Sequence, residues 1–215
     1  MRTNLNSCFL KTNHLRPAIP AGRIVSLKGK KMDTKDYSKA ILEELKKVME
    51  QVSPDACTRL CGAITNAARV FVAGAGRSGL AAKAFAMRLM HLGCDAYVCG
   101  EMVTPSFRKG DLLLIVSGSG ETASLTAMAA KAHAVGGALA LVTVRAESSI
   151  GSMAEVIVPV PAPTPKADNA FHSVQPMGAL FEQSCFLLLD AVVMELMEQL
   201  GQDEAAMYAR HANLE

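Results

Sequence analysis

Residues that could bind an anion follow a short apolar run in the middle of the chain. The run Leu112 to Val116 leads directly into Ser117-Gly118-Ser119-Gly120-Glu121-Thr122, and an alanine-rich segment follows. A buried strand, a Gly/Ser turn and a helix N-terminus in this order present free backbone N–H groups and the positive end of the helix dipole. The three hydroxyls can donate to phosphate oxygens, and the two glycines let the backbone approach a ligand closely. We therefore predict a phosphate site here, because a turn that merely caps a helix needs fewer hydroxyls and glycines.

A second glycine-rich turn carries a cation and a hydroxyl. Gly74-Ala75-Gly76-Arg77-Ser78-Gly79 follows a short apolar run that is predicted as a strand. Gly-x-Gly-x-x-Gly in this context is also the dinucleotide-binding fingerprint, which requires an acidic residue at the end of the next strand. That strand ends in Val98-Cys99-Gly100, with no acid in place. We therefore expect Arg77 and Ser78 to contact a small phosphorylated ligand rather than a dinucleotide.

Glu182 is the best candidate for a catalytic base. It lies near the start of the last predicted helix, among the apolar residues Leu180, Phe181 and Phe186. Apolar surroundings make a carboxylate a stronger base near neutral pH. The alternative is a glutamate that the helix dipole favours in a first turn.

Strands and helices alternate along the sequence in the order that a parallel sheet requires. Five short apolar segments are predicted as strands: residues 69–73, 95–99, 111–116, 138–143 and 156–158. Apolar residues at helical spacing predict helices around them, over residues 37–52, from Pro54 onward, and over 80–92, 123–135 and 177–200. Right-handed crossovers would place both glycine-rich turns at the carboxyl edge of the sheet, where ligands bind. The two turns can therefore face one ligand.

Composition and charge narrow the class of protein. A chain of 215 residues, half of them apolar, is long enough for one sizeable α/β domain. Residues 1–31 hold seven basic and no acidic residues, which leaves 15 basic and 20 acidic residues in the remainder. We predict a disordered basic leader over 1–31, either a targeting peptide or an extension upstream of a start at Met32, and a single domain over 32–215.

The composition argues against nucleic acid and membranes as binding partners. A mildly acidic body argues against nucleic acid, and no apolar run reaches the roughly 18 residues that cross a bilayer. The six cysteines are scattered without metal-like spacing, so we expect reduced thiols in a cytoplasmic protein and no metal site. The apolar stretch 177–200 predicts burial on more than one side, and hence a homodimer or homotetramer.

The two turns together resemble the sugar isomerase (SIS) family of phosphosugar-binding domains, from about Asp33 to the C-terminus. Three stretches, Gly74 to His91, Ser117 to Thr122 and Gln175 to Gln183, narrow the resemblance to members that interconvert 3-hexulose 6-phosphate and fructose 6-phosphate. Those members act in the ribulose monophosphate pathway of formaldehyde fixation. The resemblance implies a flavodoxin-like three-layer α/β/α fold with a five-stranded parallel sheet, an N-terminal helical hairpin, no metal or organic cofactor, and active sites near subunit interfaces.

The resemblance also implies roles for individual residues. Moving a carbonyl from C3 to C2 passes through an enediolate, and one carboxylate, here Glu182, can take and return the proton. Arg77 could stabilise the enediolate or a sugar hydroxyl. His91 lies at the far end of its helix, so that it would act as a catalytic or ring-opening acid from a second subunit; His172 is the competing acid.

Two other functions remain open from the sequence. The same domain serves as the ligand-binding half of transcriptional regulators, so a phosphosugar sensor without catalytic activity is one alternative. A basic leader and a helical hairpin stand here in place of their DNA-binding domain. An isomerase of another sugar phosphate, such as arabinose 5-phosphate or a heptose phosphate, is the other alternative.

Overall fold

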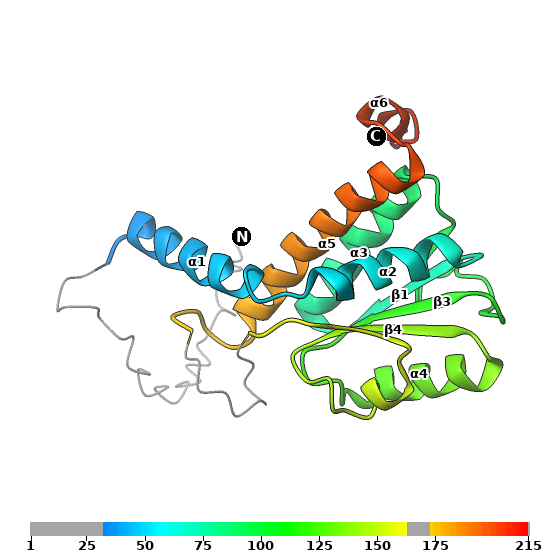
Figure 1. The fold of residues 1–215 in the computed structure, drawn as a ribbon, viewed down its shortest axis with the longest axis horizontal. Helices are drawn as coiled ribbons and strands as arrows, with labels where there is room; N and C mark the ends of the chain where they lie inside the picture. Colours follow the sequence, from blue (N-terminus) through cyan, green and yellow to red (C-terminus); the bar gives the residue numbers. More distant parts are fainter. Residues whose placement is uncertain (1–31, 163–172, 215) are drawn as a thin grey trace, which may run out of the picture. The chain divides into compact units, whose positions relative to one another are not determined.

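The computed structural model describes residues 32–162 and 173–214, and Figure 1 shows their fold. One sheet has the strand order β2-β1-β3-β4-β5, and all neighbouring strands in it are parallel. This order is that of flavodoxin-like folds, so the predicted fold class is confirmed. The strands are β1 (Val70–Gly74), β2 (Ala96–Val98), β3 (Leu112–Val116), β4 (Ala138–Thr143) and β5 (Val156–Pro159). The leader 1–31 and the candidate acid His172 lie outside the described residues.

The helices begin and end close to the residues that the sequence predicts. They are α1 (Thr34–Met49), α2 (Pro54–Asn66), α3 (Gly76–His91), α4 (Ala123–Val135), α5 (Ala179–Leu200) and α6 (Glu204–Tyr208), with a short 3₁₀ helix, η2 (Gly151–Met153). The first two form the predicted N-terminal hairpin. Asp33 caps α1 and Ser53 caps α2, each through a side-chain oxygen that accepts a backbone N–H.

Alternate residues of the strands face two separate helical layers. Val70 and Val72 pack in one cluster with α1, α2, α3 and α5, whereas Phe71 and Ala73 pack in a second cluster with α4. Figure 1 shows α4 on one side of the sheet and α2, α3 and α5 on the other. Because helices cover both faces, every residue of β3 is apolar and buried. The core therefore has the three layers that the sequence predicts.

The helix α3 follows β1 more closely than the sequence predicts. It begins at Gly76 rather than at Leu80, so that Arg77 and Ser78 belong to its first turn and not to a loop. The reason is a close backbone contact, since a Cβ built on Gly79 would lie 2.6 Å from the carbonyl oxygen of Gly74. Only glycine permits this approach, and the helix can therefore start directly at the end of the strand.

The helix α5 begins at Ala179, two residues later than predicted. Met177 has a φ of +58°, which a right-handed helix does not accept. The chain therefore turns at Met177 before the helix starts. This turn brings the segment from Met177 to Glu182 to the carboxyl edge of the sheet.

The register of β1 and β3 places the two glycine-rich turns side by side. Gly74 at the end of β1 is paired with Val116 at the end of β3. At the opposite end of the same pair of strands, the Arg69 guanidinium donates to both carboxylate oxygens of the buried Asp111, over 2.9 and 2.6 Å. The two strands are thus held in one register from end to end.

Candidate active site

The turn after β3 is held by hydrogen bonds within itself and to the next strand. The Ser117 hydroxyl oxygen accepts from the N–H of Gly120 over 3.2 Å. The carbonyl of Gly118 accepts from the Thr143 hydroxyl and from the N–H of Val144, at 3.2 and 3.1 Å. The turn is therefore fixed from behind by the end of β4, and its open side is free for a ligand.

Residues after β4 complete the support of this turn, and the sequence reading did not single them out. A Cβ on Gly120, whose φ is +64°, would collide with the side chain of Ser148. The Glu121 carboxylate accepts from the N–H and the hydroxyl of Ser149, at 2.8 and 2.6 Å, and these bonds lower the pKa of Glu121. The mostly polar residues 145–149, which follow β4, could have indicated this support, because they lie at the same carboxyl edge of the sheet as the phosphate turn.

One cavity of about 370 Å³ brings the predicted phosphate turn and the predicted base together. Its walls come from the end of β3 and from the segments where α3, α4 and α5 begin. The lining residues are Ala75, Ser78, Val116, Ser117, Gly118, Ser119, Thr122, Leu125, Met177 and Glu182. The cavity is large enough for a small ligand, and it lies at the switch point of the strand order, between β1 and β3.

The three helices that begin at this cavity have no side-chain cap. Ala75, Thr122 and Gly178 occupy the N-cap positions of α3, α4 and α5, and none of them accepts a hydrogen bond from its helix. By contrast, side chains cap α1, α2 and α6. Uncapped first turns leave backbone N–H groups available to an anion and direct three positive helix ends toward it.

Arg77 and Glu182 form an ion pair at the rim of the cavity. The Arg77 Nε donates to Glu182 Oε2 over 2.6 Å, and the exposed fractions of the two side chains are 61% and 19%. The carboxylate thus has a cationic partner, whereas the sequence led us to expect apolar surroundings. Leu180 and Phe181 are instead buried in the core, and Phe186 is exposed.

His91 does not lie in this cavity. It ends α3, at about 21 Å along the helix from Arg77 at 1.5 Å per residue. Its side chain is 4% exposed and stacks on the ring of His211, with 5.4 Å between the ring centroids. Burial, together with the charges of Arg88 and His211, lowers the pKa of His91.

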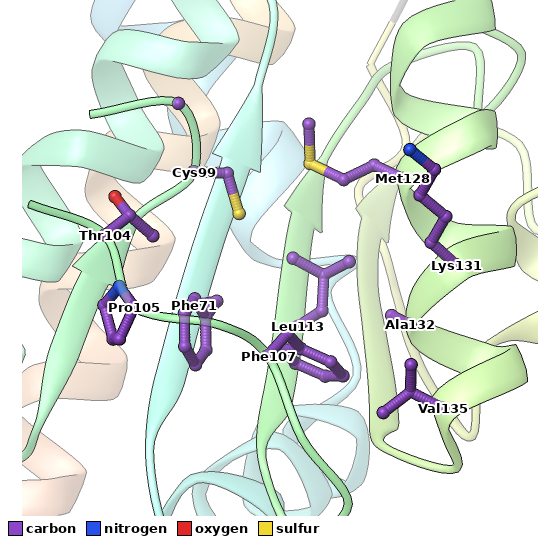
Figure 2. Close-up of a pocket in the computed structure, with 11 residues that line it drawn as sticks. Phe71, Cys99, Thr104, Pro105, Phe107, Leu113, Met128, Lys131, Ala132 and Val135 are labelled. Carbon is purple, nitrogen blue, oxygen red and sulfur yellow. The ribbon is translucent and has the colours of Figure 1, made fainter. Parts of the chain in front are cut away.

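A second cavity, of about 300 Å³, has a different chemistry (Figure 2). It lies on the α4 side of the sheet, where the connection between β2 and β3 forms no helix in the described residues. Side chains of Phe71, Leu113 and Met128 line it, and burial raises the pKa of the adjacent Cys99 thiol to about 11. Its walls are mostly apolar and lack the Gly/Ser turn, so it does not match the phosphate site that the sequence predicts, whereas the first cavity does.

The described residues hold neither a cluster of metal ligands nor a membrane-spanning helix. Residues 32–162 and 173–214 contain no group of three or more His, Cys, Asp or Glu side chains that could hold a metal ion. None of the helices in those ranges is long and apolar enough to cross a membrane.

Known proteins are similar to this chain in sequence and in fold. The family model described as the SIS domain matches residues 63–185. The 3-hexulose-6-phosphate isomerase of Bacillus subtilis is 46% identical over 185 residues, which are 86% of this chain and 100% of the relative. The protein of the same name from Methylomonas aminofaciens is 36% identical over 83% of this chain and 98% of its own.

A solved structure is similar as well. It is that of a hypothetical protein from Methanococcus jannaschii, whose description infers the function of 3-hexulose-6-phosphate isomerase. The TM-score is 0.70 at 35% identity, and the match covers 83% of this chain and 96% of that one.

Proposed function

The chain belongs to the SIS-domain family, and from this premise we propose that it is an isomerase that interconverts 3-hexulose 6-phosphate and fructose 6-phosphate. This is the reaction after which its relatives from Bacillus subtilis and Methylomonas aminofaciens are named, and the chain spans 100% and 98% of them. It is also the function that the sequence predicts. One observation carries it in the structure: the Gly/Ser turn and Glu182 line a single cavity.

The phosphate is bound at the turn after β3. Ser119 and Thr122 face the cavity with hydroxyls that no helix cap uses, and the uncapped first turns of α3, α4 and α5 add backbone N–H donors. The phosphate takes no part in bond-making, so its binding energy serves to place C2 and C3 of the sugar against the base.

Glu182 moves the proton between the two carbons. Its carboxylate takes the proton from C2 of the 3-ketose and leaves a negative charge on O3, which gives an enediolate, or an enediol once an acid protonates O3. Return of the proton to C3, with loss of the O2 proton, gives the 2-ketose. Arg77, already in contact with Glu182, orients the carboxylate and places a positive charge beside the developing oxyanion.

A second copy of the chain would supply the acid that one copy lacks. His91 and the stacked His211 lie at the end of α3 away from the cavity. The outward faces of α3 and α5 expose apolar side chains that a second copy would cover: Leu80, Met87, Met90, Leu187 and Met194. We propose a homodimer or homotetramer in which the end of α3 that carries His91 lies near the cavity of another copy, where His91 would act once the ring of His211 no longer covers it. Light scattering that gives a mass of about 22.8 kDa, one chain, would contradict this arrangement.

The free thiols support a proposal for the compartment. The five cysteines among the described residues carry free thiols. A reducing cytoplasm keeps such thiols intact, and it is the compartment that we propose.

A coupled assay tests the function. The enzyme is given 3-hexulose 6-phosphate, and fructose 6-phosphate is detected through phosphoglucose isomerase and glucose-6-phosphate dehydrogenase. We expect NADPH to form only when the enzyme is present. Conversion of arabinose 5-phosphate in place of the hexulose would overturn the choice of substrate, and binding of both sugars without conversion would favour a sensor.

A further inference from the structure

We infer that Glu44 is a positioning residue for the isomerase site, because it holds the segment that carries Met177 and Glu182 into the cavity. Glu44 lies on α1, far along the chain from that segment. The inference rests on the proposed function for its catalytic consequence. It assigns to the N-terminal hairpin a part in catalysis beyond its packing.

The Glu44 carboxylate accepts three hydrogen bonds from one short segment. The Ser173 hydroxyl donates to Oε2 over 2.7 Å, the N–H of Val174 to Oε1 over 2.7 Å, and the Gln175 side-chain amide to Oε2 over 3.2 Å. Glu44 is 8% exposed, and no ion pair joins it to a cation within residues 32–162 and 173–214. A buried carboxylate without a cation needs such donors, so the segment and Glu44 fix each other.

The hydrogen bonds to Glu44 also restrict the position of the Glu182 carboxylate. The Ser173 hydroxyl oxygen also accepts from the N–H of Gln175, which closes the network. Two residues further on, Met177 takes its left-handed conformation and lines the cavity. The carbonyl of Gly178 then accepts from the N–H of Glu182 over 3.0 Å. Eight residues thus lie between Ser173 and the base, and the hydrogen bonds named above hold both ends of this stretch.

The arrangement requires a carboxylate and not merely a polar group. An ionised carboxylate only accepts hydrogen bonds, whereas the amide of glutamine also donates. In Glu44→Gln, the amide NH₂ would face the N–H of Val174 or the side-chain amide of Gln175. The three donors of the segment would then have one acceptor oxygen instead of two, so they must reorient around it, and the segment would shift and take Glu182 with it.

The test compares Glu44→Gln with Glu43→Gln. Glu43 is the neighbouring, exposed glutamate on α1, so its substitution makes the same chemical change outside the network. We expect Glu44→Gln to lower kcat about tenfold or more, because a small misplacement of a catalytic group is costly. We expect the dissociation constant of fructose 6-phosphate to change less than about threefold, since the phosphate turn is untouched. Glu43→Gln should leave both values unchanged.

Hydrogen exchange separates positioning from general destabilisation. We expect faster exchange of the amides of residues 174–182 in Glu44→Gln, with unchanged exchange in α3 and α4. If Glu44→Gln does not fold, Ser173→Ala weakens the same network from the other side and should lower kcat in the same direction. A kcat within about twofold of the wild type in the folded variant would overturn the inference. Inactivity of the wild-type chain would instead refute the proposed function.

Discussion

The side chain of Arg77 donates from Nε to Oε2 of Glu182 over 2.6 Å, and this bond joins the first turn of α3 to the first turn of α5. The two residues are 105 positions apart in the sequence. Both lie where a helix begins, next to the turn that we assign to the phosphate. The cation therefore meets the carboxylate at the rim of the cavity in which we propose that the sugar phosphate binds.

Replacement of the base should abolish turnover and spare binding. Glu182→Gln keeps the shape of the side chain but removes its capacity to take a proton, so we expect kcat to fall about 10²- to 10⁴-fold. The dissociation constant of fructose 6-phosphate should stay within about threefold. Glu198→Gln, an exposed position on the same helix, is the control. Survival of kcat within about tenfold would exclude Glu182 as the base.

Arg77 and Glu182 should act as one unit. We expect Arg77→Gln to lower kcat, because the carboxylate loses its orientation and the oxyanion loses a positive charge. In the double variant Arg77→Gln, Glu182→Gln, the two losses should not add, since residues in contact are energetically coupled. Steady-state kinetics of the four proteins measures this coupling. Additive losses would show that Arg77 acts independently of the base.

The phosphate turn should act mainly on substrate affinity. Ser119 lines the cavity, and its oxygen accepts from the N–H of Glu121 over 3.2 Å, which leaves its hydroxyl proton free to donate. Ser119→Ala should raise KM by an amount that corresponds to about 1–3 kcal/mol, the value of a hydrogen bond to a charged group. Ser38→Ala, on the exposed face of α1, should leave KM unchanged. An unchanged KM in Ser119→Ala would remove that residue from the phosphate site.

The strands and most helices could be predicted well, because apolar runs and helical spacing depend only on residues that are close in the sequence. The apolar runs of β3 and β4, and the alanine-rich segment of α4, lie where the sequence predicts them. The start of α3 was misplaced, since the contact of Gly79 with Gly74 depends on a strand and a helix that pack in three dimensions. Sequence rules treat a glycine-rich turn as a loop, whereas this one is almost entirely the first turn of a helix.

The site was predicted in part, for a similar reason. The phosphate turn was expected at the carboxyl edge of the sheet, and Glu182 was expected to act on the sugar bound there; both line one cavity. The ion pair with Arg77 was not expected, because nothing in the sequence relates residues that far apart. The support from Ser149 and from Glu44 was missed in the same way. Both are polar contacts between segments that are far apart in the sequence, and a single sequence does not show which distant residues are in contact.

The close packing of α3 on β1 leads to a prediction for stability. Gly79→Ala places a Cβ against the carbonyl of Gly74, so we expect a loss of about 1–3 kcal/mol in the free energy of unfolding, as in other overpacked sites. Gly62 lies inside α2 with no atom within 4 Å of a Cβ at that position. Gly62→Ala should therefore stabilise the protein by about 0.5–1 kcal/mol through helix propensity. Urea unfolding of both variants tests the contrast, and equal effects would contradict it.

The buried histidine should make stability depend on pH. Folding lowers the pKa of His91 from its ordinary value of 6.5, so the unfolded chain binds a proton more readily below that pH. The free energy of unfolding should therefore fall as the pH decreases from about 6.5 toward the lowered pKa, and His91 should not change it above about pH 6.5. Urea titrations near pH 7.5 and 5.5 should show a smaller decrease in His91→Gln than in the wild type. The exposed His133, replaced by Gln, is the control, and an unchanged slope in His91→Gln would refute the assignment.

If the substrate binds at the uncapped starts of α3, α4 and α5, as we propose, the lifetime of the enzyme depends on it. A side-chain cap contributes about 1 kcal/mol to a helix, and these three helices forgo it at the cavity. A sugar phosphate that satisfies their N–H groups binds only the folded chain, and at a hundredfold excess over its dissociation constant it would add about 2.7 kcal/mol to the free energy of unfolding. Starvation for substrate would then leave a larger unfolded fraction exposed to proteolysis, so that the abundance of the catalyst follows the supply of the compound that it converts.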